Sequence, residues 1–377
     1  MRICKYMVCG FTAALSAGSV LAGDPPPLRA DLIQSGLAEP TFVASVPEDE
    51  ARLFVVEKRG RIRLIKNGVL QPNDFLNIDS LVPDQTWNGM LGLCFDPDYA
   101  TNGYLYVQHT LSGNRVCVAR YTASSNPDVA DLASRHIVLQ LSFPGVGHHV
   151  GGWIGFGPDN MLYVPLGDGG TSGDPAGGTR SQSLNSLWGK MLRIDPHAAD
   201  AYPADANRNY GFPPDNPFVG QGIGEIWVRG LRNPYRADFD DANADLWIAD
   251  VGLYMYEEVD LIEANSGGGQ NFGWDCAEGT NCIPNGNCAC NSSLTDPVYQ
   301  YMHADGCSIS GGSVYNGCAI EGMEGRYFFG DWCTGSIWSC RQEGGVLVDV
   351  EDHTSELNSG GAPDISGVTA IGVDWRG

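Results

Sequence analysis

The feature that most constrains this chain is a short repeat in which a turn residue precedes an alternating run of Leu, Tyr, Phe and Val. The copies, roughly 50 to 85 residues apart, are Arg52–Val56, Gly103–Val107, Asn160–Val164, Asp245–Ala249 and Arg326–Gly330. Short strands with turn residues at repeated intervals are typical of all-β proteins. Several similar sheet units in one chain favour an arrangement around a central axis. The repeat therefore predicts an all-β fold of the β-propeller type.

The first copy lies within a longer pattern that predicts an antiparallel meander. Pro40–Ala44, Leu53–Val56 and Arg61–Ile65 each have the pattern of a strand, and Lys58–Gly60 supplies the turn before the third. No stretch shows sustained helical periodicity, and one short helix is expected within Ser181–Leu192. We therefore expect helices to contribute little to the fold.

A sixth unit begins near the C-terminus. Asp364–Asp374 has the pattern of a first strand, and Arg376–Gly377 that of the turn after it. The sequence ends where the next strand of the unit is expected. Two interpretations remain open, an unusual closure of the ring and a truncated last blade, and we favour truncation.

The first 22 residues have the pattern of a secretory signal peptide. Arg2 and Lys5 give a positive start, Met7–Val20 is apolar and small, and Val20–Ala22 offers a small-residue cleavage site. No later segment approaches the roughly 18 uninterrupted apolar residues of a membrane span. We expect a secreted or periplasmic protein with a propeller domain over residues 30–377.

The chain is strongly acidic. Its formal net charge is −23 at pH 7, and loss of Arg2 and Lys5 with the signal peptide takes it to −25. Such a field repels nucleic acid and anionic membrane surfaces. It suits neutral or cationic partners, or calcium, and it also keeps an exported protein soluble. We therefore expect no nucleic-acid partner.

Ten of the twelve cysteines follow Ala22, an even number in a chain expected to be exported, which favours disulfides. Six of them crowd into a stretch rich in Gly and Asn, which we interpret as a disulfide-rich insertion over residues 276–318. Cys94 with Cys117 and Cys333 with Cys340 are expected local pairs. Zinc is the competing interpretation, but the usual paired CxxC spacing is absent.

Two short segments carry the residues best suited to catalysis. His149 precedes two glycines that let a ligand approach the backbone closely, and histidine titrates near neutrality. Arg232 and Asn233 precede Pro234, which places a permanent cation and an amide at a fixed point of the chain. A histidine and an arginine at neighbouring strand ends can accept a proton and stabilise developing negative charge. The alternative for each is a purely structural role.

Two acidic segments have the residue types of calcium loops. Asp168 lies among glycines and is followed by Asp174, and Asp238–Asp245 carries several carboxylates. Tight turns use the same residues, and an EF-hand's spacing and terminal Glu are absent from the second segment. We interpret the first as a turn and the second as a solvated hairpin tip.

Taken together, these segments resemble the soluble quinoprotein glucose/sorbosone dehydrogenase family. That family includes aldose sugar dehydrogenases, and its superfamily contains the propeller domain of hedgehog-interacting protein. The resemblance runs from about Leu37 to the C-terminus and implies a six-bladed β-propeller. The motifs that carry it are Gly89–Pro97, Asn102–Val107, His149–Gly152, Leu166–Gly170, Gly189–Asp195, Arg229–Pro234, Ala249–Gly252, Glu257–Asp260 and Asn271–Trp274.

The resemblance implies roles for individual residues. In catalytic members of the family, the residue matching His149 removes the proton from a sugar's anomeric hydroxyl, and hydride passes to pyrroloquinoline quinone (PQQ). The residue matching Arg232 binds the quinone oxygens and stabilises the charge that develops there. The residue matching Asn233 touches the cofactor. Backbone carbonyls matching Gly252 and Leu253 help to hold a calcium ion, Ca2+, that polarises the quinone.

The implied function is PQQ-dependent oxidation of a small-molecule aldose sugar, with an unidentified electron acceptor. Trp332 is an aromatic candidate for stacking on the quinone or sugar. The chain departs from the dehydrogenase pattern at Trp87, where those enzymes have a glutamine, and at Cys333, where they have a lysine. Ser308–Tyr315 and the cysteine-rich insertion are closer to the hedgehog-interacting branch. The alternative function is therefore a non-catalytic propeller, stabilised by calcium and disulfides, that binds carbohydrate or protein. A lactonase-type propeller is a third and weaker alternative.

Overall fold

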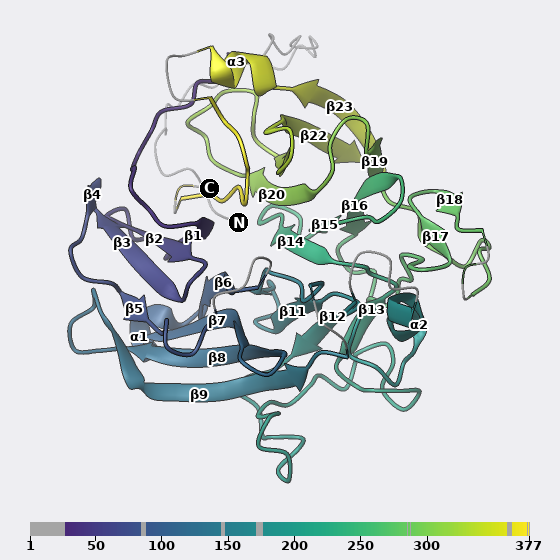
Figure 1. Cartoon of the computed structure of the whole chain (residues 1–377), viewed down its shortest axis with the longest axis horizontal. Coiled ribbons are helices and arrows are strands. Elements are labelled where there is room, and N and C mark those ends of the chain that lie inside the picture. Colours follow the sequence, from purple (N-terminus) through teal and green to yellow (C-terminus); the bar gives the residue numbers. More distant parts are fainter. Residues whose placement is uncertain are drawn as a thin grey trace, which may run out of the picture.

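The computed structural model describes residues 27–83, 88–144, 148–170, 176–284, 286, 288–359, 364–374 and 376. Within these ranges the chain is built almost entirely of strands, which confirms the predicted all-β class. Figure 1 shows antiparallel sheets arranged in a ring around a central axis. The predicted signal peptide and Trp87 lie outside the described residues.

Five sheets follow one another along the chain. The first contains β1 (Pro40–Ser45), β2 (Arg52–Glu57), β3 (Arg61–Lys66) and β4 (Val69–Leu70), with β5 (Leu76–Asn77) paired to β3. The second contains β6 (Met90–Phe95), β7 (Tyr104–Leu111), β8 (Arg115–Ala123) and β9 (Ala130–Ser142). The third contains β10 (Gly155–Phe156), β11 (Leu162–Leu166), β12 (Lys190–Ile194) and β13 (Ile226–Arg229).

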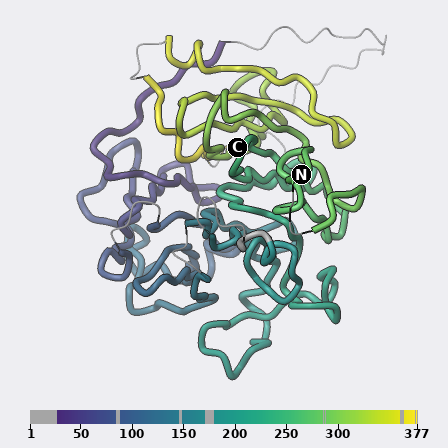
Figure 2. Tube along the Cα trace, turned by 45° about the vertical axis from the view of Figure 1, so that its right-hand side comes forward, coloured from purple at the N-terminus to yellow at the C-terminus, as the bar shows by residue number. Residues whose placement is uncertain are grey.

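The fourth sheet contains β14 (Pro234–Phe239), β15 (Leu246–Asp250), β16 (Tyr256–Ile262) and β19 (Tyr299–Met302). The fifth contains β20 (Ile309–Tyr315), β21 (Arg326–Asp331), β22 (Ile337–Glu343) and β23 (Val346–Asp352). A separate hairpin of β17 (Ala277–Glu278) and β18 (Asn281–Cys282) lies in the predicted insertion. The long connection between β12 and β13 projects from the ring (Figure 2).

The sequence repeat has one structural meaning: every copy contributes the second strand of a sheet, namely β2, β7, β11, β15 or β21. The predicted meander over the first sheet is also confirmed. These second strands are hydrogen-bonded to a partner strand on each side, and the side chains on both of their faces are largely buried. Alternating aliphatic and aromatic residues fill that position because their branched and flat side chains pack on a pleated surface.

The helix expected within Ser181–Leu192 is misplaced. The described helices are short: α1 (Tyr99–Asn102), α2 (Ala176–Gln182) and α3 (Thr354–Asn358). Residues from Lys190 onward belong to β12, which is buried along its whole length. A short strand buried on both faces has no alternation, so its pattern resembles that of a buried helix. Among the described residues, no helix is long and apolar enough to cross a membrane.

Buried side chains between neighbouring sheets form the core. Tyr106 of the second sheet meets Phe156 of the third, with ring centroids 5.3 Å apart. Trp247 of the fourth sheet stacks on Tyr327 of the fifth at 4.7 Å. This packing fixes each sheet relative to the next. It thereby fixes the positions of the strand ends that face the axis.

The innermost strands approach one another at the axis. Arg236, on β14, is 1% exposed, and its guanidinium NH2 donates to the carbonyl oxygen of Thr41 on β1, 2.5 Å away. The guanidinium also lies over the ring of Phe42, 5.0 Å from its centroid. A buried cation therefore bridges the first and fourth sheets across the centre of the ring.

The C-terminal segment 364–374 contacts both β1 and β20. Thr369 Oγ1 donates to the carbonyl oxygen of Pro40 at 2.8 Å, and Ser313 Oγ donates to that of Ile371 at 3.1 Å. The described part of this segment is not a hydrogen-bonded strand, although the sequence predicted one. It nevertheless lies beside both neighbouring inner strands, in the yellow trace at the centre of Figure 1.

The prediction of disulfides is confirmed, but both local pairs predicted from the sequence are wrong. Within the insertion, Cys276 pairs with Cys288 and Cys282 with Cys290. Cys333 pairs with Cys307 instead of Cys340. Cys340 is a buried free thiol on β22.

The expected pair of Cys94 and Cys117 is also wrong, because both are free thiols. Cys94 lies on β6 and Cys117 on β8, and β7 separates those two strands. A disulfide bridges Cα atoms only about 4.4–6.8 Å apart, a distance that an intervening strand prevents.

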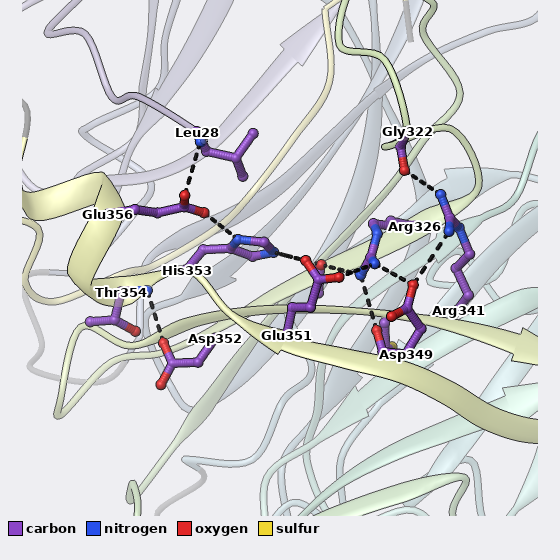
Figure 3. A network of polar contacts seen from close by, with 12 residues as sticks. Leu28, Gly322, Arg326, Arg341, Asp349, Glu351, Asp352, His353, Thr354 and Glu356 are labelled. Atoms are coloured by element: carbon purple, nitrogen blue, oxygen red, sulfur yellow. Dashed lines mark hydrogen bonds and ion pairs between the residues drawn. The ribbon is translucent and has the colours of Figure 1, made fainter. Parts of the chain in front are cut away.

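A polar network holds the outer part of the fifth sheet to the N-terminal segment (Figure 3). Arg326, 1% exposed, donates to the carboxylates of Asp349 and Glu351 on β23. His353 Nδ1 bonds Glu356 Oε1 on α3 at 2.5 Å, and the other carboxylate oxygen of Glu356 accepts the backbone N–H of Leu28 at 3.1 Å. The network thus joins a sheet edge, a helix and the chain that leads into β1.

We expect Arg326→Met to lower the free energy of unfolding by about 2 kcal/mol, because it removes a buried cation that binds Asp349, Glu351 and the hydroxyl of buried Ser339. Urea denaturation followed by tryptophan fluorescence measures the change. Arg341→Met is the matched control, since Arg341 contacts the same Asp349 from a site whose side chain is 34% exposed. Equal effects of the two substitutions would contradict the importance of the buried cation.

Candidate active site at the channel end of the inner strands

Three chain segments meet at one end of the ring and position the candidate site. The backbone N–H of Gly169 donates to the carbonyl oxygen of His149 at 3.0 Å, and that of Asp168 donates to the carbonyl oxygen of Arg232 at 2.7 Å. A Cβ on Gly167 would lie 2.6 Å from the carbonyl oxygen of His149 and 2.8 Å from that of Arg232. Only glycine fits between these strands. The Gly-Asp-Gly-Gly turn is therefore what brings the histidine and arginine segments together.

His149 is held by a carboxylate on one side. Its Nδ1 lies 2.7 Å from Asp168 Oδ1, and the other oxygen of Asp168 accepts the indole N–H of Trp274 at 2.9 Å. The backbone N–H of Gly170 donates to Asp168 Oδ1 at 2.8 Å. An ionised Asp168 that accepts these bonds places the proton of a neutral imidazole on Nδ1. The lone pair of Nε2 then points away from Asp168.

Arg232 lies on that other side. Its NH2 is 3.2 Å from His149 Nε2, and its NH1 donates to the carbonyl oxygen of Val251 at 2.6 Å. The guanidinium carbon lies 5.5 Å from the centroid of the Trp274 ring. Arg232 Nε is buried and has no hydrogen-bond partner among the described residues. The sequence predicted these two side chains separately, and the structure brings them into contact.

Burial and charge set the protonation states of the pair. Burial lowers the pKa of His149, Asp168 opposes this, and the cationic Arg232 lowers it further. Burial alone would raise the pKa of Asp168, but the hydrogen bond from His149 and the neighbouring positive charges hold it below its usual value. His149 is therefore neutral and Asp168 ionised at neutral pH. A neutral, oriented imidazole is the state that a general base requires.

Asn233 and the loop after β15 form the next part of the site. Asp250 accepts the backbone N–H of Arg232 at 2.8 Å and that of Asn233 at 2.6 Å. Asn233 Oδ1 is buried and has no hydrogen-bond partner within the described ranges. Asp250 thus fixes the backbone of both predicted residues, while the side-chain oxygen of Asn233 keeps an open hydrogen-bonding position.

Gly252 and Leu253 lie in a tight loop surrounded by carboxylates. Glu278 accepts the backbone N–H of Leu253, and Glu257 Oε2 lies 3.4 Å from that of Gly252. A Cβ on Gly252 would lie 1.6 Å from the carbonyl oxygen of Tyr256. With the amides of this loop bonded to carboxylates, its carbonyl oxygens are the groups left to meet a cation. Within the described ranges, no cluster of three or more His, Cys, Asp or Glu side chains is arranged to hold a metal ion.

Trp332 and Cys333 follow β21 on the fifth sheet. Trp332 is 47% exposed, and a Cβ on Gly367, at the start of the C-terminal segment, would lie 3.6 Å from its indole nitrogen. The disulfide to Cys307 occupies Cys333. The chain therefore presents an exposed aromatic ring at this place and no cationic side chain at residue 333.

Asp168 is the functional candidate that sequence reasoning missed. It was interpreted as part of a turn, and the turn exists, but the carboxylate also orients His149. The turn brings residues 19 positions apart into hydrogen-bonding distance. A signal for this role was present, since the carboxylate follows a strand that runs toward the same end of the ring as His149. The second acidic segment is a hairpin turn, as predicted, in which Asp240 accepts the N–H of Ala242. The predicted solvation of this tip is wrong at Asp240 and Asp245, whose exposures are only 6% and 5%.

Two cavities lie elsewhere in the described part of the chain, and neither includes the His149–Arg232 pair. The larger, of about 520 Å3, is at the opposite ends of the inner strands and is lined by Phe42, Asp96, Phe156, Asp238 and Phe239 among others. The smaller, of about 350 Å3, lies between the loop after Leu253 and the hairpin of β17 and β18. The candidate site is therefore defined by the convergence of His149, Asp168 and Arg232 and not by a cavity.

A second histidine has the partners of a hydrolytic triad but no access to a substrate. His353 Nε2 lies 2.7 Å from Ser339 Oγ, and its Nδ1 bonds Glu356. Ser339 is fully buried, and the buried guanidinium of Arg326 donates to its hydroxyl oxygen at 2.9 Å. A nucleophile must be reachable by the bond that it attacks, so we assign this cluster a structural role.

Comparison with known proteins adds independent information. A family model described as Glucose / Sorbosone dehydrogenase matches residues 37–359. The HIPL1 protein of Arabidopsis thaliana is 30% identical over 84% of this chain and 54% of its own length, and hedgehog-interacting protein of Mus musculus is 28% identical over 86% and 49%. The chain thus spans about half the length of these curated relatives. The PQQ-bound aldose sugar dehydrogenase of Streptomyces coelicolor superposes with a TM-score of 0.66 at 24% identity, covering 87% of this chain and 86% of that one, a likeness of fold.

Proposed function

We propose, from the premise that this chain belongs to the glucose/sorbosone dehydrogenase family, that it is an exported oxidoreductase acting on aldose sugars. The observation that carries the proposal is the contact of His149 with both Asp168 and Arg232. These three groups provide an oriented base and a cation at one point of the site. Removal of a proton from an anomeric hydroxyl, with loss of hydride from the same carbon, needs both.

His149 acts as the base through Nε2. Asp168 holds the proton on Nδ1, so the lone pair of Nε2 is directed at Arg232 and at any hydroxyl that takes its place. The proton of the anomeric hydroxyl passes to Nε2, and Asp168 stabilises the resulting imidazolium. The sugar carbon loses hydride and becomes the carbonyl carbon of a lactone. Arg232 supplies a fixed positive charge beside the acceptor of that hydride.

The quinone end of PQQ fits the groups present here. Arg232 Nε and Asn233 Oδ1 are buried polar atoms that lack a partner among the described residues, and a bound group with carbonyl and N–H functions would satisfy them. Trp332 offers an exposed ring for stacking. When bound, the quinone supplies the two-electron acceptor that side chains lack. We propose that Arg232, Asn233 and Trp332 hold it.

Calcium fits the loop of Gly252 and Leu253 through backbone carbonyls. The carboxylate of Glu278 binds the amides of this loop, and oxygen ligands are those that Ca2+ prefers. We propose that these two carbonyls, completed by water or by the cofactor, hold the ion.

The remaining elements of the proposal concern architecture and location. We propose that the segment 364–374 is the inner strand of a sixth blade, because it lies between β1 and β20. The three described disulfides, Cys276–Cys288, Cys282–Cys290 and Cys307–Cys333, support an oxidising compartment, and we propose secretion or export to the periplasm.

A second candidate function is a propeller that binds carbohydrate or protein without catalysis. It is favoured by the Cys307–Cys333 disulfide, because a disulfide cannot supply the cation expected there. Loss of a charge-assisted partner weakens the binding of an anionic cofactor. Similarity to the HIPL1 protein is compatible with this candidate.

Dye reduction separates the two functions. The purified, disulfide-intact protein is incubated with PQQ and calcium chloride, and reduction of an artificial electron acceptor is followed with glucose and other aldoses. The dehydrogenase predicts sugar-dependent reduction that chelation of calcium abolishes. If the dye is not reduced and calorimetry detects no heat of PQQ binding, the dehydrogenase is excluded and the non-catalytic binding propeller remains.

A further prediction concerns Asp168. Because Asp168 raises the pKa of His149, Asp168→Asn is expected to lower that pKa further, so the acid limb of kcat/KM moves to lower pH. The plateau value of kcat/KM should fall at least about tenfold, because His149 becomes a weaker base and loses the carboxylate that orients it. The full pH profile is the measurement, with Asp131→Asn, at an exposed site, as control. A lower plateau with an unmoved acid limb would show that Asp168 is only structural.

A further inference from the structure

We propose that the cavity between the loop 253–256 and the disulfide-linked hairpin of β17 and β18 is an outer sugar subsite. It would make the preferred substrate a reducing oligosaccharide instead of a monosaccharide. The inference rests on the proposed function, since it takes the reducing end of that glycan to lie beside His149. The cavity of about 350 Å3 is lined by Tyr254, Met255, Tyr256, Glu278, Asn281 and the residues 282–284.

The composition of the walls fits a neutral sugar ring. Tyr254 and Met255 are 55% and 48% exposed, large apolar side chains that a soluble protein seldom presents together without a use. Flat aromatic rings supply much contact area at low conformational cost, and their polar edges remain available for hydrogen bonds. Asn281 adds an exposed amide at the rim. Small-ligand sites are commonly of this size, mainly apolar with a few polar groups.

The two walls are held rigidly together. Glu278, on the hairpin, accepts the backbone N–H groups of Leu253, Tyr254 and Met255, the last two at 2.7 Å and 3.2 Å. One carboxylate thus binds three successive amides of the opposite wall. A cleft that is already formed binds its ligand without the entropic cost of ordering a loop.

The hairpin itself is anchored on its outer side. The disulfides Cys276–Cys288 and Cys282–Cys290 cross-link it, and Gly279 and Thr280 donate backbone N–H groups to Glu258 and Gln300 of the fourth sheet. Because the cysteine-rich insertion is cross-linked and anchored, it keeps the wall of the cavity in a fixed position. It forms a permanent wall next to the active site.

An aromatic path connects the cavity with the catalytic pair. The rings of Tyr254 and Trp274 lie 6.4 Å apart, and the Trp274 indole N–H donates to Asp168, which orients His149. Trp274 also packs against Arg232. One buried side chain, that of Trp274, therefore lies between the cavity and the catalytic pair. A glycan with its first residue at His149 can extend toward Tyr254.

The acidic charge near the cavity favours a neutral glycan over an anionic one. Glu278 borders the cavity, and the chain as a whole carries a net charge of −23. An anionic glycan would be repelled from this environment. A neutral oligosaccharide is the ligand that combines hydroxyls for the rim with apolar ring faces for Tyr254 and Met255.

The test compares affinities for sugars of one and three residues. The disulfide-intact chain is titrated calorimetrically with glucose, maltotriose, cellotriose and laminaritriose. At least one trisaccharide is expected to bind about tenfold more tightly than glucose, a difference of about 1.4 kcal/mol. Tyr254→Ala should bring that ratio close to one. Tyr254→Phe, which keeps the ring, should preserve it within about twofold.

Met302→Ala is the control, because Met302 is 46% exposed on the adjacent β19 but does not line the cavity. Equal affinity for glucose and all three trisaccharides overturns the subsite, whether or not glucose supports dye reduction. A ratio that Tyr254→Ala leaves unchanged also overturns it and points to a protein occupant of this face. A Tyr254-dependent trisaccharide preference without any dye reduction supports the subsite and refutes the dehydrogenase.

Discussion

His149→Ala is expected to lower turnover of an aldose by about 10²- to 10⁴-fold, the range that a positioned general base contributes. The side chain contacts Asp168 and Arg232 and is buried, so its removal takes away the only group of this trio that can accept a proton near neutral pH. Binding of PQQ and calcium should change little. Stopped-flow dye reduction gives turnover, and calorimetry gives the cofactor affinity.

The control for this substitution is His197→Ala. His197 pairs with Asp96 at a site where its side chain is 42% exposed, far along the chain from the catalytic segments. It should leave turnover unchanged. If His149→Ala retained turnover within a few-fold of the parent protein, another group would have to be the base. If it instead abolished PQQ binding, His149 would be a cofactor ligand and not primarily a base.

The all-β class followed from the repeat, because each copy is a strand covered on both faces, and this environment selects aliphatic and aromatic residues strongly. The positions of His149 and Arg232 were predictable for a related reason. Glycines near them mark places where other chain segments approach closely, since a Cβ on Gly151 would lie 2.3 Å from the carbonyl oxygen of Pro165 and one on Gly230 would lie 2.3 Å from Asn271 Oδ1. Local sequence therefore identified the strands, and glycine identified where their ends converge.

Local sequence could not predict which residues of distant segments contact one another. The disulfide of Cys307 with Cys333 depends on how β20 and β21 are placed, and the nearer Cys340 in the sequence is directed into the core instead. The partnership of Asp168 with His149 depends on a turn whose residues also suit calcium or a plain reversal of the chain. In both cases several partners were chemically equivalent, and only the register of the strands selects one.

Arg232→Ala is expected to have the second large effect, because this residue serves two functions at once. Turnover should fall by about 10²- to 10³-fold, as on removal of one preorganised donor from a developing charge. Affinity for PQQ should fall as well, since the guanidinium is the cation nearest the proposed quinone position. Arg232→Lys should recover only part of either property. A single ammonium cannot reproduce the planar fork that meets Val251 and His149 together.

The combined variant His149→Ala/Arg232→Ala decides whether the two side chains act as one unit. They are in contact, so their separate losses should not add, and the double substitution should cost little more than the worse single one. Full additivity of the two losses in kcat/KM would mean that base and cation act at independent points. Arg232 would then hold the cofactor only, and its 3.2 Å contact with His149 Nε2 would have no part in proton transfer. Non-additivity, with His149 still required when Arg232 is replaced by lysine, is the result that the proposed mechanism predicts.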